Sequence, residues 1–219
     1  MKKYFEILRK CPLFKQIEDE NLINMLSCLN AKVVAFDKKY TILTEGSSAK
    51  YIGILLSGSA QIIQIDFYGN RSILSNIKPS QMFGEAFACA ETKSIPVTVT
   101  ANEPCEVMFI DCSCILHTCN NNCSFHRQLI FNLMKDLAVK TLLFHQKIEI
   151  ISKRSTREKL LTFLTIEAKK TKSNSFDISY DRQELADYLE VDRSGLSAEI
   201  SKLRKEGIIK NRKNHFKLL

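Results

Sequence analysis

Short apolar runs separated by turn-forming residues predict a set of β-strands in the N-terminal half of the chain. Between two of these runs, Gly69-Asn70 can adopt the positive φ angles that a tight hairpin turn requires. Closely spaced strands and turns of this kind are typical of a small all-β sandwich or barrel. The predicted strands are Tyr51–Leu56, Ala60–Phe67, Arg71–Ile77, Val97–Ala101 and Glu106–Ile110, and short helices are predicted before them at Tyr4–Leu8 and Glu20–Leu29.

A helical period replaces the strand pattern from about Asn122 onwards. Ile130, Leu137, Phe144 and Ile151 recur every seven residues. A stripe of this period predicts a long helix that pairs with its equivalent in a second copy of the chain. The alternative is a helix whose stripe packs only on the chain's own β domain. The residues that flank the stripe are Leu133, Met134, Thr141 and Ile148.

Two short helices joined by a brief turn are predicted near the C-terminus. Asp181 can cap the first helix, and Glu190-Val191-Asp192 forms the turn before the second. One face of the second helix is apolar, and the other carries small or cationic side chains that suit close approach to a DNA groove. This arrangement is a helix-turn-helix, and Gly207–Leu218 predicts a basic β-hairpin wing after it. The candidate DNA contacts are Arg182, Gln183, Arg193, Ser194, Ser197, Ser201, Lys202, Arg204, Arg212 and Lys213.

Charge and composition support this division of the chain. The net charge is +8, and residues 126–219 hold all of the excess positive charge, which indicates a polyanion-binding C-terminal part. With 45% apolar and 26% charged residues, the chain is an ordinary globular protein. It has no apolar run long enough for a simple membrane span, and Met1–Glu6 lacks the apolar region of a signal peptide. We therefore expect a cytoplasmic protein with free thiols and no membrane partner.

These features resemble the CRP/FNR family of bacterial transcription regulators across essentially the whole chain. The strongest matches are Phe83-Gly84-Glu85, Cys105-Glu106-Val107, and the segment Arg182–Leu189 leading into Asp192-Arg193-Ser194. The resemblance implies an α+β fold with an N-terminal double-stranded β-roll (jelly-roll-like), a long dimerisation helix and a C-terminal winged helix-turn-helix. The corresponding domains are 1–121, 122–152 and 153–219.

The resemblance also implies partners. A homodimer would bind a palindromic operator in double-stranded DNA, and RNA polymerase would be a further partner. Many family members carry a second arginine one turn into the recognition helix, where this chain has Ala198. Arg193 therefore remains the candidate reader of guanine. The chain has no G-x-S-x-G, P-loop or HExxH motif, so we expect no enzymatic activity.

The effector pocket that the resemblance implies departs from the pattern of cyclic AMP binding. Gly84 and Glu85 match the start of the phosphate-binding segment, but the Arg-Ser pair that holds the phosphate falls on Ile95 and Pro96. Isoleucine has no side-chain donor, and proline lacks even its backbone N–H. We therefore expect a small effector other than cyclic AMP. Alternatively, Gly84 and Glu85 have only a structural role, as a turn and as a carboxylate that accepts backbone hydrogen bonds. The candidate effector contacts are Gly84, Glu85, Ile95, Leu142 and Leu143.

A cluster of cysteines and histidines between residues 112 and 126 predicts an alternative function, metal or redox sensing. Thiolate and imidazole ligands suit zinc or iron, and the candidate ligands are Cys119, Cys123 and His126. The spacing matches no standard zinc signature, so buried and inert thiols are the other interpretation. The cysteines interpreted as packing residues are Cys11, Cys28, Cys89 and Cys105.

Overall fold

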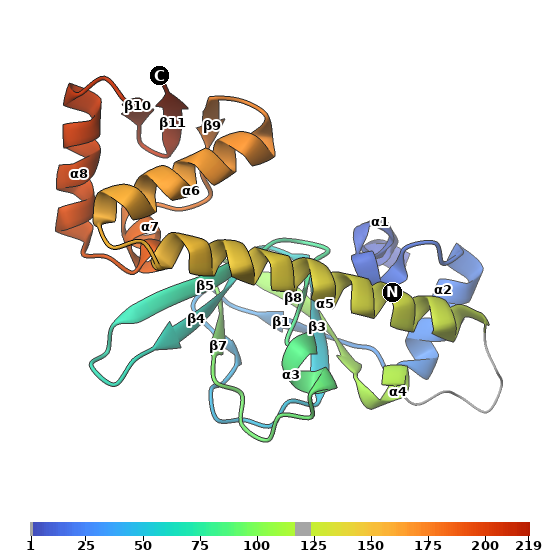
Figure 1. The fold of residues 1–219 in the computed structure, drawn as a ribbon. Coiled ribbons are helices and arrows are strands. Elements are labelled where there is room, and N and C mark those ends of the chain that lie inside the picture. The colour runs from blue at the N-terminus through green and yellow to red at the C-terminus, as the bar shows by residue number, and fades with distance from the viewer. Residues whose placement is uncertain (1, 117–123) are drawn as a thin grey trace. The chain divides into compact units, whose positions relative to one another are not determined.

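The computed structural model describes the backbone of residues 2–116 and 124–219 (Figure 1). Contacts along the chain divide it into two compact units, and the boundary falls inside the long helix rather than at one of its ends. The first unit comprises Met1–Asn70 and Leu74–Thr141, and the second comprises Arg71–Ile73 and Leu142–Leu219.

Two four-stranded antiparallel sheets form the β part of the first unit. Their strand orders are β1-β8-β3-β6 and β2-β7-β4-β5. Strands β3 and β8 pair from Tyr51 opposite Asp111 to Ser57 opposite Glu106, and they form the middle of the first sheet. The strands are β1 (Lys32–Phe36), β2 (Thr41–Leu43), β3 (Tyr51–Ser57), β4 (Ala60–Ile65), β5 (Arg71–Ile77), β6 (Met82–Phe83), β7 (Thr98–Ala101) and β8 (Cys105–Asp111).

Strand β3 is buried on both faces because it lies between two apolar layers. Ile52 and Ile54 join the layer formed with the N-terminal helices and the long helix. Leu55 points to the opposite side and joins the layer between the two sheets, as the two-residue period of a strand requires. The helices before the sheets are η1 (Lys2–Tyr4), α1 (Phe5–Lys10), η2 (Pro12–Phe14) and α2 (Asp19–Cys28).

A close approach of β3 and β6 depends on glycine at position 53. A Cβ atom there would lie 2.2 Å from Cζ of Phe83, which is far inside van der Waals contact. The absence of a side chain at Gly53 lets the Phe83 ring fill the layer between the sheets, where only 1% of it is exposed. Helix α3 (Glu85–Cys89) follows this ring directly, with Gly84 as its N-cap.

The long helix α5 (Ser124–Ile151) has 28 residues, and a short helix, α4 (Ser113–Leu116), lies before it in the chain. The seven-residue stripe does not form one exposed line along this helix. Ile130 and Leu137 pack against the core of the first unit, whereas 46% of Phe144 is exposed. The exposed apolar side chains of α5 are Phe131, Met134, Val139, Leu142, Leu143, Phe144 and Ile148.

The second unit packs three helices against a small sheet with the strand order β10-β11-β9. Leu164, Leu189, Ile200 and Phe216 are buried in its core. Helix α6 begins with a capping box, in which the Ser155 hydroxyl accepts a hydrogen bond from the backbone N–H of Glu158. The elements are α6 (Thr156–Thr171), β9 (Ser175–Asp177), α7 (Arg182–Leu189), α8 (Arg193–Lys205), β10 (Ile209–Arg212) and β11 (His215–Leu218).

The predicted α+β fold class is confirmed, with antiparallel sheets, a long helix and a C-terminal helix-turn-helix. The local sequence pattern did not predict β1, β2, β6 or α3. Strand β1 is mostly exposed and shows no alternation; it is held by pairing with β8, from Lys32 opposite Phe109 to Phe36 opposite Cys105. No helix in the part of the chain that the structure describes is long and apolar enough to cross a membrane.

Candidate nucleic-acid interface

The helix-turn-helix is formed by α7, a three-residue turn and α8. Asp181 caps α7 by accepting a hydrogen bond of 2.8 Å from the backbone N–H of Glu184, and the Glu184 carboxylate accepts one in return. In the turn, Glu190 adopts a left-handed conformation with φ of 53°. Asp192 then caps α8, because its Oδ2 atom accepts a hydrogen bond of 2.9 Å from the N–H of Gly195. Both helix starts are therefore defined by local polar contacts.

The serine side chains on the exposed face of α8 project little from the helix. Their hydroxyl groups donate hydrogen bonds to the neighbouring polar groups described next. Ser197 donates a hydrogen bond of 2.9 Å to the carbonyl of Arg193, and Ser201 donates one of 3.0 Å to the carbonyl of Ser197. Ser194 donates to the Asp192 carboxylate. The hydroxyl oxygens still have lone pairs for accepting hydrogen bonds from base amino groups. The exposed cations on α8 are Arg193, Lys202, Arg204 and Lys205.

Arg182, at the first position of α7, has a partly buried guanidinium group. Its Nη1 atom is buried and has no hydrogen-bond partner in the described structure. Burial lowers the pKa of Arg182, and the positive charges of Arg204 and Arg193 lower it further. The structure thus brings Arg193 and Arg204, two further predicted DNA contacts, within electrostatic range of Arg182. Neighbouring Gln183 is exposed and donates a hydrogen bond of 2.7 Å to Asp187.

Arg157, on α6, anchors α8 and was missed by the sequence analysis. Its Nη1 atom lies 3.0 Å from Glu199 Oε1, and its Nη2 atom lies 2.5 Å from Glu206 Oε2. These pairs span 42 and 49 residues of sequence, so no local pattern predicts them. They raise the pKa of Arg157. The carboxylates of Glu199 and Glu206 are therefore both paired with Arg157.

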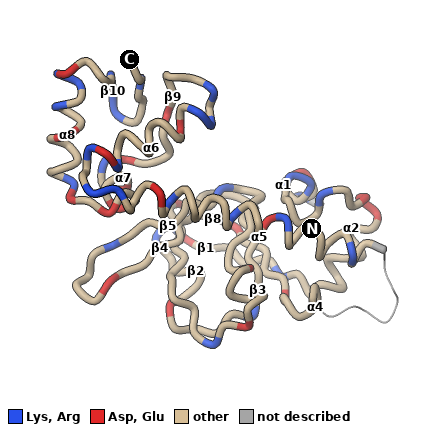
Figure 2. The backbone as a smooth tube through the Cα atoms, viewed as in Figure 1, with Lys and Arg blue, Asp and Glu red and all other residues tan. Residues whose placement is uncertain are grey.

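The wing is an antiparallel hairpin in which Ile209 pairs with Leu218 and Arg212 pairs with His215. Phe216 is buried beneath it and connects it to β9. Arg212 and Lys213 are exposed at the turn of the hairpin, where Lys213 has φ of 52°. Figure 2 shows lysine and arginine both along α8 and on the C-terminal hairpin. The predicted wing contacts are therefore accessible to a phosphate backbone.

The predicted effector residues Gly84 and Glu85 lie together at the start of α3. Gly84 adopts a φ of 78° and forms the N-cap of the helix. Glu85 is only 4% exposed, and its Oε1 atom accepts a hydrogen bond of 2.8 Å from Lys140 Nζ on α5. The same ammonium group donates 2.8 Å to the carbonyl of Met82 and lies 2.9 Å from Asp136 Oδ2. The hydrogen-bond donor to the Oε1 atom of Glu85 is therefore the ammonium group of Lys140 and not a backbone N–H.

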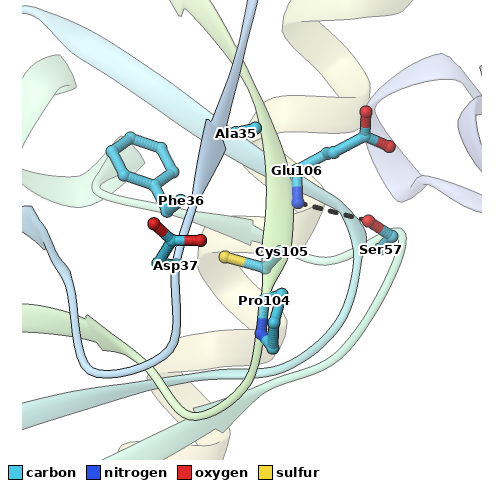
Figure 3. A pocket seen from close by; sticks show the side chains of 7 residues that line it. All are labelled: Ala35, Phe36, Asp37, Ser57, Pro104, Cys105 and Glu106. Carbon is cyan, nitrogen blue, oxygen red and sulfur yellow. Dashed lines mark hydrogen bonds between the residues drawn. The ribbon is translucent and has the colours of Figure 1, made fainter.

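The other predicted effector residues are Ile95 in the first unit and Leu142 and Leu143 in the second. Ile95 is 1% exposed, and its backbone exchanges hydrogen bonds with Ser47 and Gly46. Leu142 and Leu143 belong to the second unit, and 65% and 51% of these residues are exposed. The open cavity of about 370 Å³ in Figure 3 lies elsewhere, beside Pro104, where β1 and β8 run together.

The Cys/His cluster is described only in part. Cys119 and Cys123 lie outside the described residues. The Nε2 atom of His126 lies 2.9 Å from the carbonyl oxygen of Ile115, so this nitrogen is engaged with the backbone. Cys112 is buried and Cys114 is half-buried. Across residues 2–116 and 124–219, no three histidine, cysteine or acidic side chains are grouped so that they could hold a metal ion.

Comparison with known families identifies both halves of the chain. Residues 33–122 match the model of the cyclic nucleotide-binding domain, and residues 158–219 match that of the Crp-like helix-turn-helix domain. Among curated proteins, no sequence matches the chain significantly.

Solved structures of similar fold cover nearly the whole chain at low sequence identity. The c-di-GMP-responsive global regulator CLP from Xanthomonas campestris has a TM-score of 0.73 at 16% identity, covering 91% of this chain and 99% of its own. FixK2 from Bradyrhizobium japonicum has a TM-score of 0.65 at 18% identity, with coverage of 86% and 92%. A CRP-family transcriptional regulator from Thermus thermophilus has a TM-score of 0.60 at 20% identity, with coverage of 85% and 91%.

Proposed function

The chain is a DNA-binding transcription regulator of the CRP/FNR type, and we propose that it acts as a homodimer on a palindromic operator under the control of a small effector other than cyclic AMP. The observation that carries this proposal is the cationic face of the helix-turn-helix. There, the charges of Arg193 and Arg204 repel that of Arg182, and the Nη1 atom of Arg182 is buried without a hydrogen-bond partner in the described structure. Phosphate groups would supply the negative charge that offsets this repulsion.

In the proposed complex, α8 enters the major groove and Arg193 reads guanine through a bidentate contact. Ser194, Ser197 and Ser201 accept or donate hydrogen bonds at base edges or phosphates. The remaining predicted contacts, Gln183 at the start of α7, Lys202 on α8, and Arg212 and Lys213 on the wing, bind phosphates and set the register of the helix. RNA polymerase is the proposed partner of the DNA-bound dimer, and the cytoplasm is its proposed location.

Selection of operator sequences from genomic DNA, followed by fluorescence anisotropy on the selected duplex, tests this function. Arg193→Ala should weaken binding by about five- to 150-fold, which is the effect of losing one bidentate base contact worth about 1–3 kcal/mol. The control Arg127→Ala removes an exposed arginine from α5 in the first unit and should leave the affinity unchanged. Failure to enrich any sequence, or equal affinity for all duplexes, would contradict the proposal.

The exposed side of α5 supports the proposed homodimer. Phe131, Met134, Ala138, Thr141 and His145 are all exposed, and their spacing alternates between three and four residues. The same spacing continues to Ile148, which is 59% exposed. This alternation is that of the a and d positions of a coiled coil, so a second copy of the helix is the proposed occupant. Half of this seam, namely Met134, Thr141 and Ile148, consists of residues that flank the predicted seven-residue stripe.

Analytical ultracentrifugation tests the dimer. The double variant Met134→Glu, Ile148→Glu places four like charges in the proposed seam of a dimer and should sediment as a monomer. The control Ile23→Glu changes an apolar residue on α2 that is 47% exposed and should remain dimeric. A wild-type protein that is monomeric at micromolar concentration, or a dimer that survives both seam substitutions, would contradict this assignment.

The proposed effector differs from cyclic AMP because the described roll offers no cation for the cyclic phosphate at the predicted position. Ile95 is buried there, and Pro96 has no N–H to donate. In addition, Lys140 already occupies one oxygen of the Glu85 carboxylate. Isothermal titration with cyclic AMP should give no binding heat up to millimolar concentration. Micromolar binding of cyclic AMP would overturn this part of the proposal.

Metal sensing at the Cys/His cluster remains a separate prediction. Two of its three candidate ligands, Cys119 and Cys123, lie outside the described residues, and His126 is bonded to the Ile115 carbonyl. Elemental analysis of anaerobically purified protein decides the matter. One equivalent of zinc or iron that is lost on Cys119→Ser and Cys123→Ser substitution would support the site, and metal-free protein with unchanged DNA binding would remove it.

A further inference from the structure

Two cysteines of the first unit lie in contact although they are 23 residues apart in sequence. Cys89 is the last residue of α3, and Cys112 directly follows β8. Their Sγ atoms are 3.7 Å apart, and neither belongs to a disulfide. This separation is the contact distance of two thiols, and closing it to the covalent length of about 2.05 Å needs a movement of less than 2 Å. The sequence alone assigned Cys89 to packing and Cys112 to a different cluster.

We propose that Cys89 and Cys112 form a reversible dithiol–disulfide site that hydrogen peroxide oxidises. The Cys89 thiolate attacks one oxygen of the peroxide, the O–O bond breaks, and the released hydroxide takes a proton to become water. Cys89 is then a sulfenic acid. The sulfur of Cys112 attacks Sγ of Cys89, the S–O bond breaks, and the departing hydroxide takes the Cys112 proton to form a second water. Two thiols lose two electrons in total, and the peroxide accepts both.

The surroundings of the pair give its two members different roles. Cys89 is half-buried and can meet a small oxidant, whereas Cys112 is 3% exposed and reacts only with its neighbour. The hydrogen bond between the two sulfurs, in which either thiol can be the donor, lowers the pKa of Cys89 against the opposing effects of burial and of the Glu85 charge. The same bond and burial raise the pKa of Cys112. Cys89 is therefore the attacking residue and Cys112 the resolving one.

The other described cysteines make useful internal references. Burial raises the pKa of Cys11 to about 12, and burial also raises the pKa of Cys105. No thiol–thiol contact is described for Cys11, Cys28 or Cys105 in the structure of residues 2–116 and 124–219. Oxidation by a stoichiometric amount of peroxide should therefore concentrate at Cys89, where thiolate character and access coincide.

Peptide mapping of the full-length protein tests the site directly. The reduced protein is treated with one equivalent of hydrogen peroxide, its free thiols are alkylated after denaturation, and the digest is analysed by mass spectrometry without reduction. The expected result is a linked peptide pair joining Cys89 to Cys112 that dithiothreitol separates, with Cys11 and Cys105 recovered as alkylated thiols. A disulfide between other cysteines, or an unreacted Cys89, would overturn the proposal.

Two single variants separate the attacking from the resolving role. In Cys112→Ser, Cys89 should stop at the sulfenic acid, which dimedone traps. In Cys89→Ser, Cys112 should remain a thiol under the same treatment, because it is buried and lacks its partner. Sulfenic acid at Cys112 in the second variant would show that the roles are wrongly assigned.

The position of the pair connects it to the long helix. Glu85, at the start of the same five-residue helix α3, holds Lys140 of α5 at 2.8 Å. A disulfide at the end of α3 would restrain the helix that carries this carboxylate, so oxidation should change how α5 is held. This consequence rests on the proposed DNA-binding function, whereas the chemistry of the pair does not.

Operator affinity measured before and after oxidation tests the connection. Wild-type protein should change its affinity several-fold on oxidation and regain it with dithiothreitol, and Cys89→Ser should show no change. A complete disulfide with unchanged affinity would refute the link to α5. Absence of DNA binding in both redox states would instead refute the proposed function, while the mapped disulfide would still establish the site.

Discussion

The ammonium group of Lys140 lies 2.8 Å from the Glu85 carboxylate, so a residue of α5 holds the first residue of α3. Asp136, one turn before Lys140 on the same helix, shares this cation. Two carboxylates with 6% and 10% of their side chains exposed thus depend on one lysine. The Oε2 atom of Glu85 is buried without a hydrogen-bond partner in the described structure, which makes the cation more important to this carboxylate.

Replacing Lys140 by methionine should therefore destabilise the first unit. The substitution leaves two largely buried carboxylates without their cation, and because Lys140 is itself partly exposed we expect a loss of about 2 kcal/mol rather than the larger cost of a fully buried pair. Urea unfolding measures the change. The control Lys135→Met removes an exposed lysine from the same helix and should change the free energy of unfolding by less than about 0.5 kcal/mol. Equal effects of the two substitutions would contradict this account.

Arg157→Ala should weaken operator binding although Arg157 is not a proposed DNA contact. The substitution removes the ion pairs of Arg157 with Glu199 and Glu206, which connect α6 to α8 and its C-terminal end. It leaves these two carboxylates without a cationic partner on α6. We expect a several-fold loss of affinity that grows at low salt, because the new repulsion is electrostatic. The charge-matched control Arg154→Ala should lose less, since no ion pair to α8 is described for this exposed residue. Anisotropy titrations at two salt concentrations make the comparison.

Arg182→Met should lower the affinity for the operator without lowering the thermal stability of the protein. The guanidinium is partly buried, its Nη1 atom lacks a partner, and its pKa is lowered by burial and by two neighbouring arginines. Removing it should leave thermal stability unchanged or improved, because the folded protein alone does not satisfy this charge. Operator affinity should fall, and the slope of log affinity against log salt should decrease by about one phosphate contact. A clear loss of stability with full DNA affinity would contradict the assignment.

The lowered pKa of Lys147 should make the free energy of unfolding of the second unit depend on pH. Burial lowers its pKa from 10.5 to about 8, although its ammonium group lies 3.8 Å from the centre of the Tyr188 ring and donates to the Tyr188 carbonyl. Between about pH 8 and 10.5, Lys147 is therefore mostly protonated in the unfolded chain and mostly neutral in the folded one. In this window the contribution of Lys147 to the free energy of unfolding should rise with pH, by up to about 3 kcal/mol.

The variant Lys147→Met isolates that contribution. Unfolding free energies of wild type and variant, compared at pH 7, 9 and 10, should show the wild type gaining relative to the variant as the pH rises. Tyrosine ionisation affects both proteins and cancels in the difference. A difference that stays constant from pH 7 to pH 10 would show that Lys147 is charged throughout this range.

The local sequence pattern was sufficient to predict an element wherever the contacts that define it lie within one short segment. The turn at Gly69-Asn70 is stabilised by the nearby Asp66 carboxylate, which accepts hydrogen bonds from the N–H groups of Tyr68 and Asn70. The caps Ser155 and Asp181 likewise bond to residues three positions away. Interactions this close in sequence leave a recognisable spacing of residue types, so the helix starts and the hairpin could be predicted.

The same reasoning explains why the seven-residue stripe of α5 allowed two interpretations. Seven-residue spacing identified a long helix, but Ile130 and Leu137 turned inward while Met134 and Ile148 turned outward. A helix that is apolar on several sides offers more than one stripe of equal period. Only the position of the sheet beneath it decides which stripe is buried.

The order of residues along the chain was enough to determine a β-rich first half, a long helix and a capped helix-turn-helix with a basic face, because each depends on periodicity or on contacts within a few positions. Tertiary structure alone decided that Lys140 meets Glu85, that Arg157 anchors α8, and that Cys89 touches Cys112. These pairs join residues far apart in sequence. Their partners are chosen by how the sheets and helices pack, and no spacing within a single segment records that choice.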